Sequence, residues 1–156
     1  MIFQSVTTES TAQFAGSYRG SPDRCLSSMT VEFGGEVGTS PDRVSYQMIV
    51  FGQRARSYLR RLGKSEIDAN HRSTLRATIA AQLFTDFIFV HPFADGNGHT
   101  ARAMVAMIYL SDKARLTGWP VEPRSNSVDY VDLAQKFRKG EMKPFVDLLL
   151  SSSGAV

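Results

Sequence analysis

The chain has 156 residues, of which 42% are hydrophobic and 21% are charged, and its formal net charge is +3. This length suits one domain with a packed core and is too short for two ordinary domains. A single cysteine, Cys25, excludes an intrachain disulfide and a cluster of metal-binding thiolates. No apolar run is long enough for a membrane helix, and the first ten residues lack the basic and apolar regions of a Sec signal peptide.

The first part of the chain predicts a β-hairpin that leads into a helix. Residues 29–33 alternate apolar and polar side chains, residues 34–35 are two glycines suited to a turn, and residues 36–39 return. The tetrapeptide Ser-Pro-Asp-Arg occurs at 21–24 and again at 40–43, and it is typical of a helix start. The first of these helices should be only about one turn long. Because two strands alone are marginal in water, we expect the hairpin to lean on a helical body.

The rest of the chain has the periodicity of amphipathic helices, with apolar residues at every third or fourth position. The predicted long helices cover residues 41–62, 67–90, 97–116, 127–139 and 142–150. The helix over 67–90 is apolar on most sides and should be central. It must end near His91, because Pro92 disfavours helical geometry in the residue before it. We therefore predict an all-α fold with one small β-hairpin, and a frayed Ser-Ser-Ser-Gly-Ala end.

Five basic residues gather on the first long helix: Arg54, Arg56, Arg60, Arg61 and Lys64. Such a group can mark a nucleic-acid surface. No aromatic residues interleave with it in a binding pattern, so a solvated helix face is the better interpretation. We expect neither nucleic acid nor a membrane as a partner.

The most informative segment is His-Pro-Phe-Ala-Asp-Gly-Asn-Gly-His-Thr-Ala-Arg at residues 91–102. A histidine such as His91 can accept a proton from a hydroxyl at neutral pH. Asp95 has the hard oxygen ligands that Mg²⁺ uses beside substrate phosphates. The glycines that flank Asn97 stand at a predicted helix start, where free N–H groups bind anions. Arg102 follows one turn later and can grip a terminal phosphate. This pattern predicts a nucleotide phosphate site.

The same segment resembles the signature of the Fic (filamentation induced by cAMP) family, His-x-Phe-x-Asp/Glu-Gly-Asn-Gly-Arg-x-x-Arg. Seven positions match at fixed spacing: His91, Phe93, Asp95, Gly96, Asn97, Gly98 and Arg102. The Gly16-x-Tyr18-Arg19 stretch and the Lys-Pro-Phe at 143–145 also resemble the family, more loosely. The resemblance implies one Fic-like domain over residues 1–156, with its core at about 16–150, a flap hairpin at about 29–39 and a signature loop at 91–102.

The resemblance also implies an activity, because Fic enzymes mostly transfer AMP from ATP to a Ser, Thr or Tyr hydroxyl of a target protein. His91 would be the general base, and Asp95 would hold Mg²⁺. The phosphates of ATP would contact Gly96, Asn97, Gly98, His99 and Arg102. The flap would align the target segment by strand-like pairing along Thr30, Val31, Glu32 and Phe33. The implied cofactor is Mg²⁺, with ATP as co-substrate and a protein as target.

His99 is the one departure, because the signature has arginine there. Histidine is shorter and presents fewer donors, so the grip on a triphosphate should be weaker. Three hypotheses follow: a slower AMP transferase, a site for another phosphate-containing donor, or a domain that binds nucleotide without catalysis. Two further alternatives concern Arg102 and a possible zinc site. Arg102 could pair with Glu141 or Asp86, and the spacing of His91, Asp95 and His99 could suit zinc on a continuous helix, which Pro92, Gly96 and Gly98 oppose.

Many Fic proteins carry an inhibitory glutamate in a Ser/Thr-x-x-x-Glu-Gly/Asn motif. The nearest match is Ser5-Val-Thr-Thr-Glu9-Ser10, which fails at the last position. We therefore expect no complete built-in inhibitor, and either constitutive competence or control by a separate antitoxin-like protein. The protein should act in the cytoplasm, as a toxin would, or as an effector delivered into a host cell by a route other than Sec.

Overall fold

A computed structural model describes residue 14 and residues 16–22, 26–64, 66–119 and 128–154. Within these ranges a short 3₁₀ turn, η1 (Pro41–Arg43), leads into the first of five α-helices. The α-helices are α2 (Val44–Leu62), α3 (Ala69–Val90), α4 (Asn97–Ser111), α5 (Tyr130–Arg138) and α6 (Lys143–Ser151). The strands are β1 (Glu32–Phe33), β2 (Glu36–Val37), β3 (Arg115–Leu116) and β4 (Ser153–Gly154). The predicted all-α fold with a small hairpin is confirmed.

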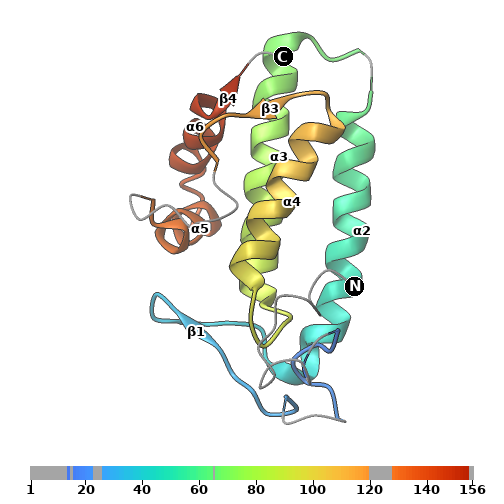
Figure 1. Ribbon diagram of the computed structural model, residues 1–156, viewed down its shortest axis with the longest axis vertical. Helices are drawn as coiled ribbons and strands as arrows, with labels where there is room; N and C mark the ends of the chain where they lie inside the picture. Colours follow the sequence, from blue (N-terminus) through green and yellow to red (C-terminus); the bar gives the residue numbers. More distant parts are fainter. Residues whose placement is uncertain (1–13, 15, 23–25, 65, 120–127, 155–156) are drawn as a thin grey trace.

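Helix α3 is the centre of the molecule, with α2 and α4 beside it and α5 and α6 on its other flank (Figure 1). Its start is fixed by Asp68, whose carboxylate accepts hydrogen bonds from the N–H groups of Asn70 and His71. From Arg76 to Val90 most of its side chains are buried, on all sides of the helix. An apolar surface this wide can be buried only when other helices cover it on several sides, which explains the central position.

Helix α4 is shorter than predicted, and the chain beyond it forms a strand. The helix ends at Ser111, and Lys113 then takes a left-handed backbone conformation with φ of 54°. Strand β3 follows and pairs antiparallel with β4, Arg115 opposite Gly154 and Leu116 opposite Ser153. The sequence did not predict this strand, because the helical periodicity placed residues 97–116 in one helix. The same pairing shows that the predicted fraying of the Ser-Ser-Ser-Gly-Ala end was wrong for Ser153 and Gly154.

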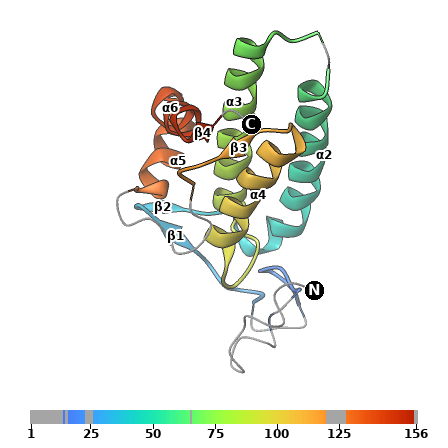
Figure 2. The same ribbon diagram turned by 45° about the horizontal axis from the view of Figure 1, so that its top comes forward.

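The hairpin β1–β2 is the predicted flap, with Glu32 opposite Val37 and Phe33 opposite Glu36. Both central glycines of its turn have positive φ, 57° for Gly34 and 77° for Gly35, as a tight two-residue hairpin turn requires. Its strands are two residues each, shorter than predicted from the alternation. After β2 the N–H of Thr39 donates to the carbonyl of Phe89 in α3, and before β1 the carbonyl of Met29 accepts from the side chain of Arg19. Both views show the flap crossing the end of the helical body near the start of α4 and reaching toward α5 (Figures 1 and 2).

The other predicted elements match within a few residues, and the one-turn helix at 21–24 falls partly outside the described residues. The aromatic side chains Phe84, Trp119, Tyr130 and Phe145 pack together where α3, α5 and α6 meet. Among the described residues, no helix is both long enough and apolar enough to cross a membrane.

Candidate active site

His91 lies at the point where α3 stops, in a left-handed conformation with φ of 48° and ψ of 59°. Its N–H still donates to the carbonyl of Phe87, so the helix is completed before Pro92 redirects the chain. The ring Nδ1 lies 3.3 Å from the carbonyl oxygen of Ile88. A carbonyl oxygen only accepts, so this contact places the proton on Nδ1 and leaves Nε2 as the basic nitrogen.

The electrostatic surroundings keep this imidazole neutral. Burial lowers the pKa of His91 below its ordinary 6.5, and the positive charge of Arg19 lowers it further, while the contact with Ile88 and the charge of Asp95 act in the opposite direction. Burial dominates because the charged imidazolium loses more hydration than the neutral ring. A lowered pKa in a histidine with one free nitrogen is the property expected of a general base at neutral pH.

Asn97 holds the signature loop in shape. Its side-chain oxygen accepts the N–H of Phe93 at 3.0 Å, and its side-chain nitrogen donates to the carbonyl of Phe93 at 2.8 Å. The residue is only 2% exposed. Phe93 itself packs against Tyr18 and Phe87. The side-chain amide of Asn97 thus bonds within the loop, and its part in nucleotide binding stays a prediction.

The first turn of α4 brings the glycines and the arginine together. Gly96 has φ of 77° and precedes the helix, which begins at Asn97. A Cβ atom on Gly98 would lie 3.2 Å from Nη1 of Arg102, so the guanidinium sits directly beside this glycine. Arg102 is 4% exposed, and the central carbon of its guanidinium group is 5.8 Å from the ring centre of Tyr130. Free N–H groups at a helix start and an adjacent guanidinium make a surface that suits phosphate.

Asp95 and His99 are exposed at the same loop, within reach of solvent. One oxygen of Asp95 accepts the N–H of Gly96 at 2.6 Å, which orients the carboxylate. Among the described residues no group of three or more His, Cys, Asp or Glu side chains could hold a metal ion. The zinc alternative for His91, Asp95 and His99 is therefore wrong. Mg²⁺ needs fewer protein ligands, because phosphates and water complete its shell, and a single exposed carboxylate fits that requirement.

The flap places an aromatic ring over the imidazole of His91. Phe33 stacks on His91 with ring centres 5.9 Å apart and planes at 20°. Phe33 also packs edge to face with Phe89, with ring centres 4.7 Å apart. Val31 is half-buried, and Thr30 and Glu32 are exposed. The side chains of the predicted target-aligning stretch therefore alternate between the protein and the solvent. The flap thus covers His91 on one side with an apolar ring and keeps polar positions at the surface.

Helix α5 holds the tip of the flap, which the sequence did not reveal. The side-chain nitrogen of Gln135 donates to the carbonyls of Phe33 at 3.3 Å and Gly34 at 2.8 Å. Glu36 lies 3.4 Å from Arg138 and 3.6 Å from Lys139. These ion pairs are exposed and contribute little stability each. They join residues about a hundred positions apart, so no local pattern could have predicted them.

Arg19 is the second feature whose role the sequence did not reveal, although it stands in the Gly-x-Tyr-Arg stretch that resembles the family. It is completely buried. All of its side-chain hydrogen bonds go to backbone carbonyls, one of which belongs to His91. The sequence carries no signal of such a role, because backbone carbonyls, unlike acidic side chains, cannot be recognised by residue type.

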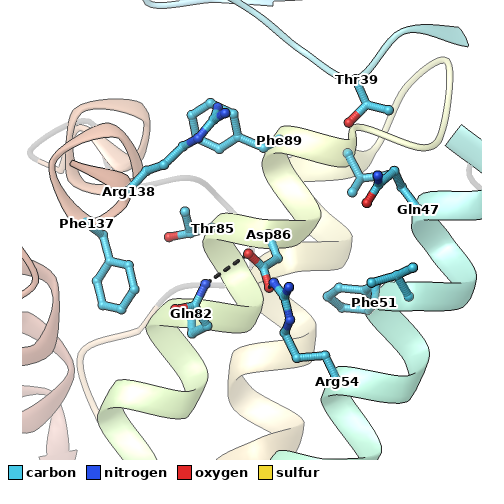
Figure 3. A pocket seen from close by; sticks show the side chains of 12 residues that line it. Thr39, Gln47, Phe51, Arg54, Gln82, Thr85, Asp86, Phe89, Phe137 and Arg138 are labelled. Carbon is cyan, nitrogen blue, oxygen red and sulfur yellow. Dashed lines mark hydrogen bonds and ion pairs between the residues drawn. The ribbon is translucent and has the colours of Figure 1, made fainter. Parts of the chain in front are cut away.

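A cavity of about 380 Å³ lies across α3, between α2 and α5 (Figure 3). Its walls include Asp86, which pairs with Arg54 at 2.6 Å and also accepts from Gln82 at 2.9 Å. The partners that the structure gives Asp86 are therefore Arg54 and Gln82, and the alternative pairing of Arg102 with Asp86 or Glu141 stays a prediction. None of the residues lining this cavity belongs to the signature segment, although Phe89 and Thr39 on its rim lie close to the base of the flap.

Comparison with known proteins agrees with this arrangement. The sequence profile of the Fic/DOC family matches residues 8–109. Relatives include the protein adenylyltransferase Fic of Drosophila sechellia, Drosophila simulans and Drosophila melanogaster, each 28% identical over 83 residues. The aligned segment is 51% of this chain but only 16% of each relative. Because the family profile covers more than half of the chain and includes His91 and Arg102, this chain belongs to the Fic/DOC family.

Proposed function

We propose that this chain transfers AMP from ATP to a Ser, Thr or Tyr hydroxyl of a target protein. Nε2 of His91 takes the hydroxyl proton as the target oxygen attacks the α-phosphorus. A new bond forms between that oxygen and phosphorus, the bond between the α-phosphorus and its bridging oxygen breaks, and pyrophosphate leaves with the electron pair. The products are the AMP-modified target, pyrophosphate and a proton, which His91 returns to solvent.

The observation that carries the proposal is the state of His91. Its Nδ1 contact with Ile88 leaves Nε2 free, and burial lowers the pKa of the ring, so the base is neutral at pH 7. His91 stands at the end of the loop that leads into the first turn of α4. A free basic nitrogen beside a phosphate-binding helix start is the pairing that phosphoryl transfer to a hydroxyl needs.

The other signature residues bind the nucleotide. The N–H groups of Asn97 and Gly98 and the guanidinium of Arg102 would hold phosphate oxygens, whereas the N–H of Gly96 donates to Asp95. His99 lies at the exposed edge of the same turn. Asp95 would hold Mg²⁺, which when bound neutralises charge on the phosphates. The flap would align the target along residues 30–33, and it presents Phe33 toward His91.

Intact-mass spectrometry of the pure protein tests this proposal. We would incubate it with Mg²⁺ and ATP beside His91→Ala and the control His71→Ala, which removes an exposed histidine on α3. We expect the unsubstituted chain and the control to gain the mass of AMP by self-modification, or to pass it to protein added in excess. His91→Ala should lose at least about a hundredfold in rate. Undiminished transfer by His91→Ala would contradict the base assignment.

A second candidate rests on His99, which stands where the family signature has arginine. A weaker triphosphate grip favours a donor other than ATP, or binding without transfer. Repeating the incubation with the other nucleoside triphosphates separates these cases, since a different His91-dependent mass increase identifies another donor. Binding of Mg²⁺ and ATP by calorimetry with no mass increase on any protein would favour a binding module. The inhibitory match at Ser5–Ser10 lies outside the described residues.

A further inference from the structure

The side chain of Arg19 joins the flap to the end of α3. Its Nε donates to the carbonyl of His91 at 2.6 Å, and one Nη donates to the carbonyl of Val90 at 3.0 Å. The same Nη donates to the carbonyl of Thr39 at 2.9 Å, and the other Nη donates to that of Met29 at 2.6 Å. The guanidinium is therefore bonded to the chain before the hairpin, the chain after it, and the residue that carries the base.

These bonds fall where α3 needs partners. The last turn of a helix has carbonyls without intrahelical donors, and buried carbonyls without a donor are costly. Arg19 supplies donors to Val90 and His91, and its own N–H donates to Pro92 at 2.7 Å. Positive charge at a helix C-terminus is also favourable. The helix end is thus capped from the flap side of the molecule.

The backbone of His91 needs such support. A non-glycine residue at φ of 48° lies in the left-handed region, which costs an L-residue about 1 kcal/mol. Arg19 bonds the carbonyl of this residue and of its neighbours on both sides. Without those bonds the peptide could relax, and the ring would move relative to the start of α4.

The two ends of the flap meet at the same guanidinium. Met29 precedes β1 and Thr39 follows β2, and the Gly38 N–H closes the base of the hairpin on Val31 at 3.0 Å. The Thr39 N–H then donates to the carbonyl of Phe89, in the last turn of α3. If the chain at Met29 and Thr39 moves, it must therefore break hydrogen bonds to Arg19, the side chain that also holds the backbone of His91.

We propose that Arg19 is a positioning residue that couples the flap to the general base, so that target alignment and the placement of His91 are fixed by one side chain. This inference rests on the proposed function for its consequence in catalysis, but the coupling itself is a property of the fold. Lysine cannot replace arginine in this role, because its single ammonium group cannot span carbonyls on four sides as the planar fork does.

The test is Arg19→Lys, with Arg60→Lys as the matched control on the exposed face of α2. Hydrogen exchange measured by NMR should show the amides of Gly38 and Thr39 opening about tenfold or more faster in Arg19→Lys. Amides in the middle of α3 and α4 should keep their protection in both variants. Unchanged exchange at the flap base of a folded Arg19→Lys protein would overturn the proposal.

The ring of His91 gives a second readout that does not depend on activity. The chain has three histidines, so labelled ring signals can be assigned with His91→Ala. In Arg19→Lys the flap loosens and His91 gains hydration, so the titration midpoint of His91 should rise toward the ordinary value. A purely structural role for Arg19 would lower the folded fraction and leave this midpoint unmoved.

Transfer and binding complete the test. Arg19→Lys should bind Mg²⁺ and ATP within about twofold of the unsubstituted chain, because the side-chain hydrogen bonds of Arg19 reach none of the predicted phosphate-binding residues. Transfer should fall about tenfold or more. If the unsubstituted chain shows no transfer, the proposed function fails while exchange and titration still decide the coupling. If Arg19→Lys does not fold, exchange in the unsubstituted chain decides it. Hydrogen exchange of the Arg19 Nε–H and of the backbone N–H groups of Gly38 and Thr39 should then give the same opening free energy. Different opening free energies for these groups would refute the coupling.

Discussion

The protonation of His91 is decided by where the side chain sits. Burial beneath Phe33 removes water from the ring, and the charge of Arg19 adds to the same effect. Both disfavour the imidazolium form, so the pKa falls below 6.5. The charged form of Asp95 opposes this shift without cancelling it.

The pH dependence of transfer should report this shift. Because the pKa is lowered, His91 stays neutral at pH 7 and gains a proton only at more acidic pH than an ordinary histidine. The single-turnover rate should therefore be flat near pH 7 and fall through a midpoint below 6.5. His99→Arg should keep this midpoint even where its rate differs, since it leaves His91 in place. A midpoint at or above 6.5 would contradict the burial argument.

The chemistry of single residues was largely readable from the sequence. The spacing of His91, Asp95 and Arg102 predicted a phosphate site, and the structure brings these residues to one loop and the first turn of one helix. The site assignments themselves stay predictions. The role of Arg19 was not readable, because its partners are backbone carbonyls far along the chain, and a carbonyl has no residue type to recognise.

The flap as an element is anchored differently at its two ends. Its base is held by hydrogen bonds to the buried side chain of Arg19. Its tip depends instead on Gln135 and on exposed ion pairs of Glu36. Buried bonds resist opening more than exposed ion pairs do. Motion of the flap should therefore begin at the tip.

Alanine at the two turn glycines tests the tip. Both Gly34 and Gly35 have positive φ, so either substitution should cost about 1 kcal/mol in unfolding free energy. A Cβ at Gly34 would also lie 2.4 Å from the side-chain nitrogen of Gln135, whereas Gly35 faces open space. Only Gly34→Ala should release the tip, seen as faster exchange of the flap amides. Equal exchange in both variants would contradict the role of Gln135.

Local patterns predicted the helix starts well and the end of α4 poorly. Asp68 and Asp129 cap α3 and α5 through bonds to residues two and three positions on, which is short-range chemistry. The end of α4 depends instead on the pairing of Arg115–Leu116 with Ser153–Gly154, at the other end of the described chain. A periodic sequence is still predicted to be helical when the strand that pairs with it lies far along the chain.

At the scale of the whole molecule, the ion pairs of Asp112 and the predicted site lie at opposite ends of the central helix. Near the start of α3, Arg72 and Arg76 both pair with Asp112, which follows α4 and whose side chain is 3% exposed. Arg76 donates to it at 2.6 Å. The flap and the signature loop lie at the opposite end of the bundle (Figure 1).

Removal of this carboxylate should lower the unfolding free energy without changing the predicted site, which lies far from Asp112. Asp112→Ala leaves the largely buried Arg76 without its acceptor, so the unfolding free energy should fall by about 3–5 kcal/mol. Urea denaturation measures this, with Asp147→Ala as the control for an exposed pair with Lys143. In the folded variant the His91 titration should be unchanged. A loss no greater than that of the control would show that Asp112 does not hold α3 and α4 together.

The pairing of β3 with β4 also has a practical consequence. Thr117 donates to the carbonyl of Ser152, so the end of α6 is fixed against the segment after α4. In Figure 1 this junction lies at the end of the bundle remote from the flap. A tether attached near Ser153 would therefore hold the protein to a surface with its flap facing solution, which suits single-molecule measurements of flap opening on the immobilised protein.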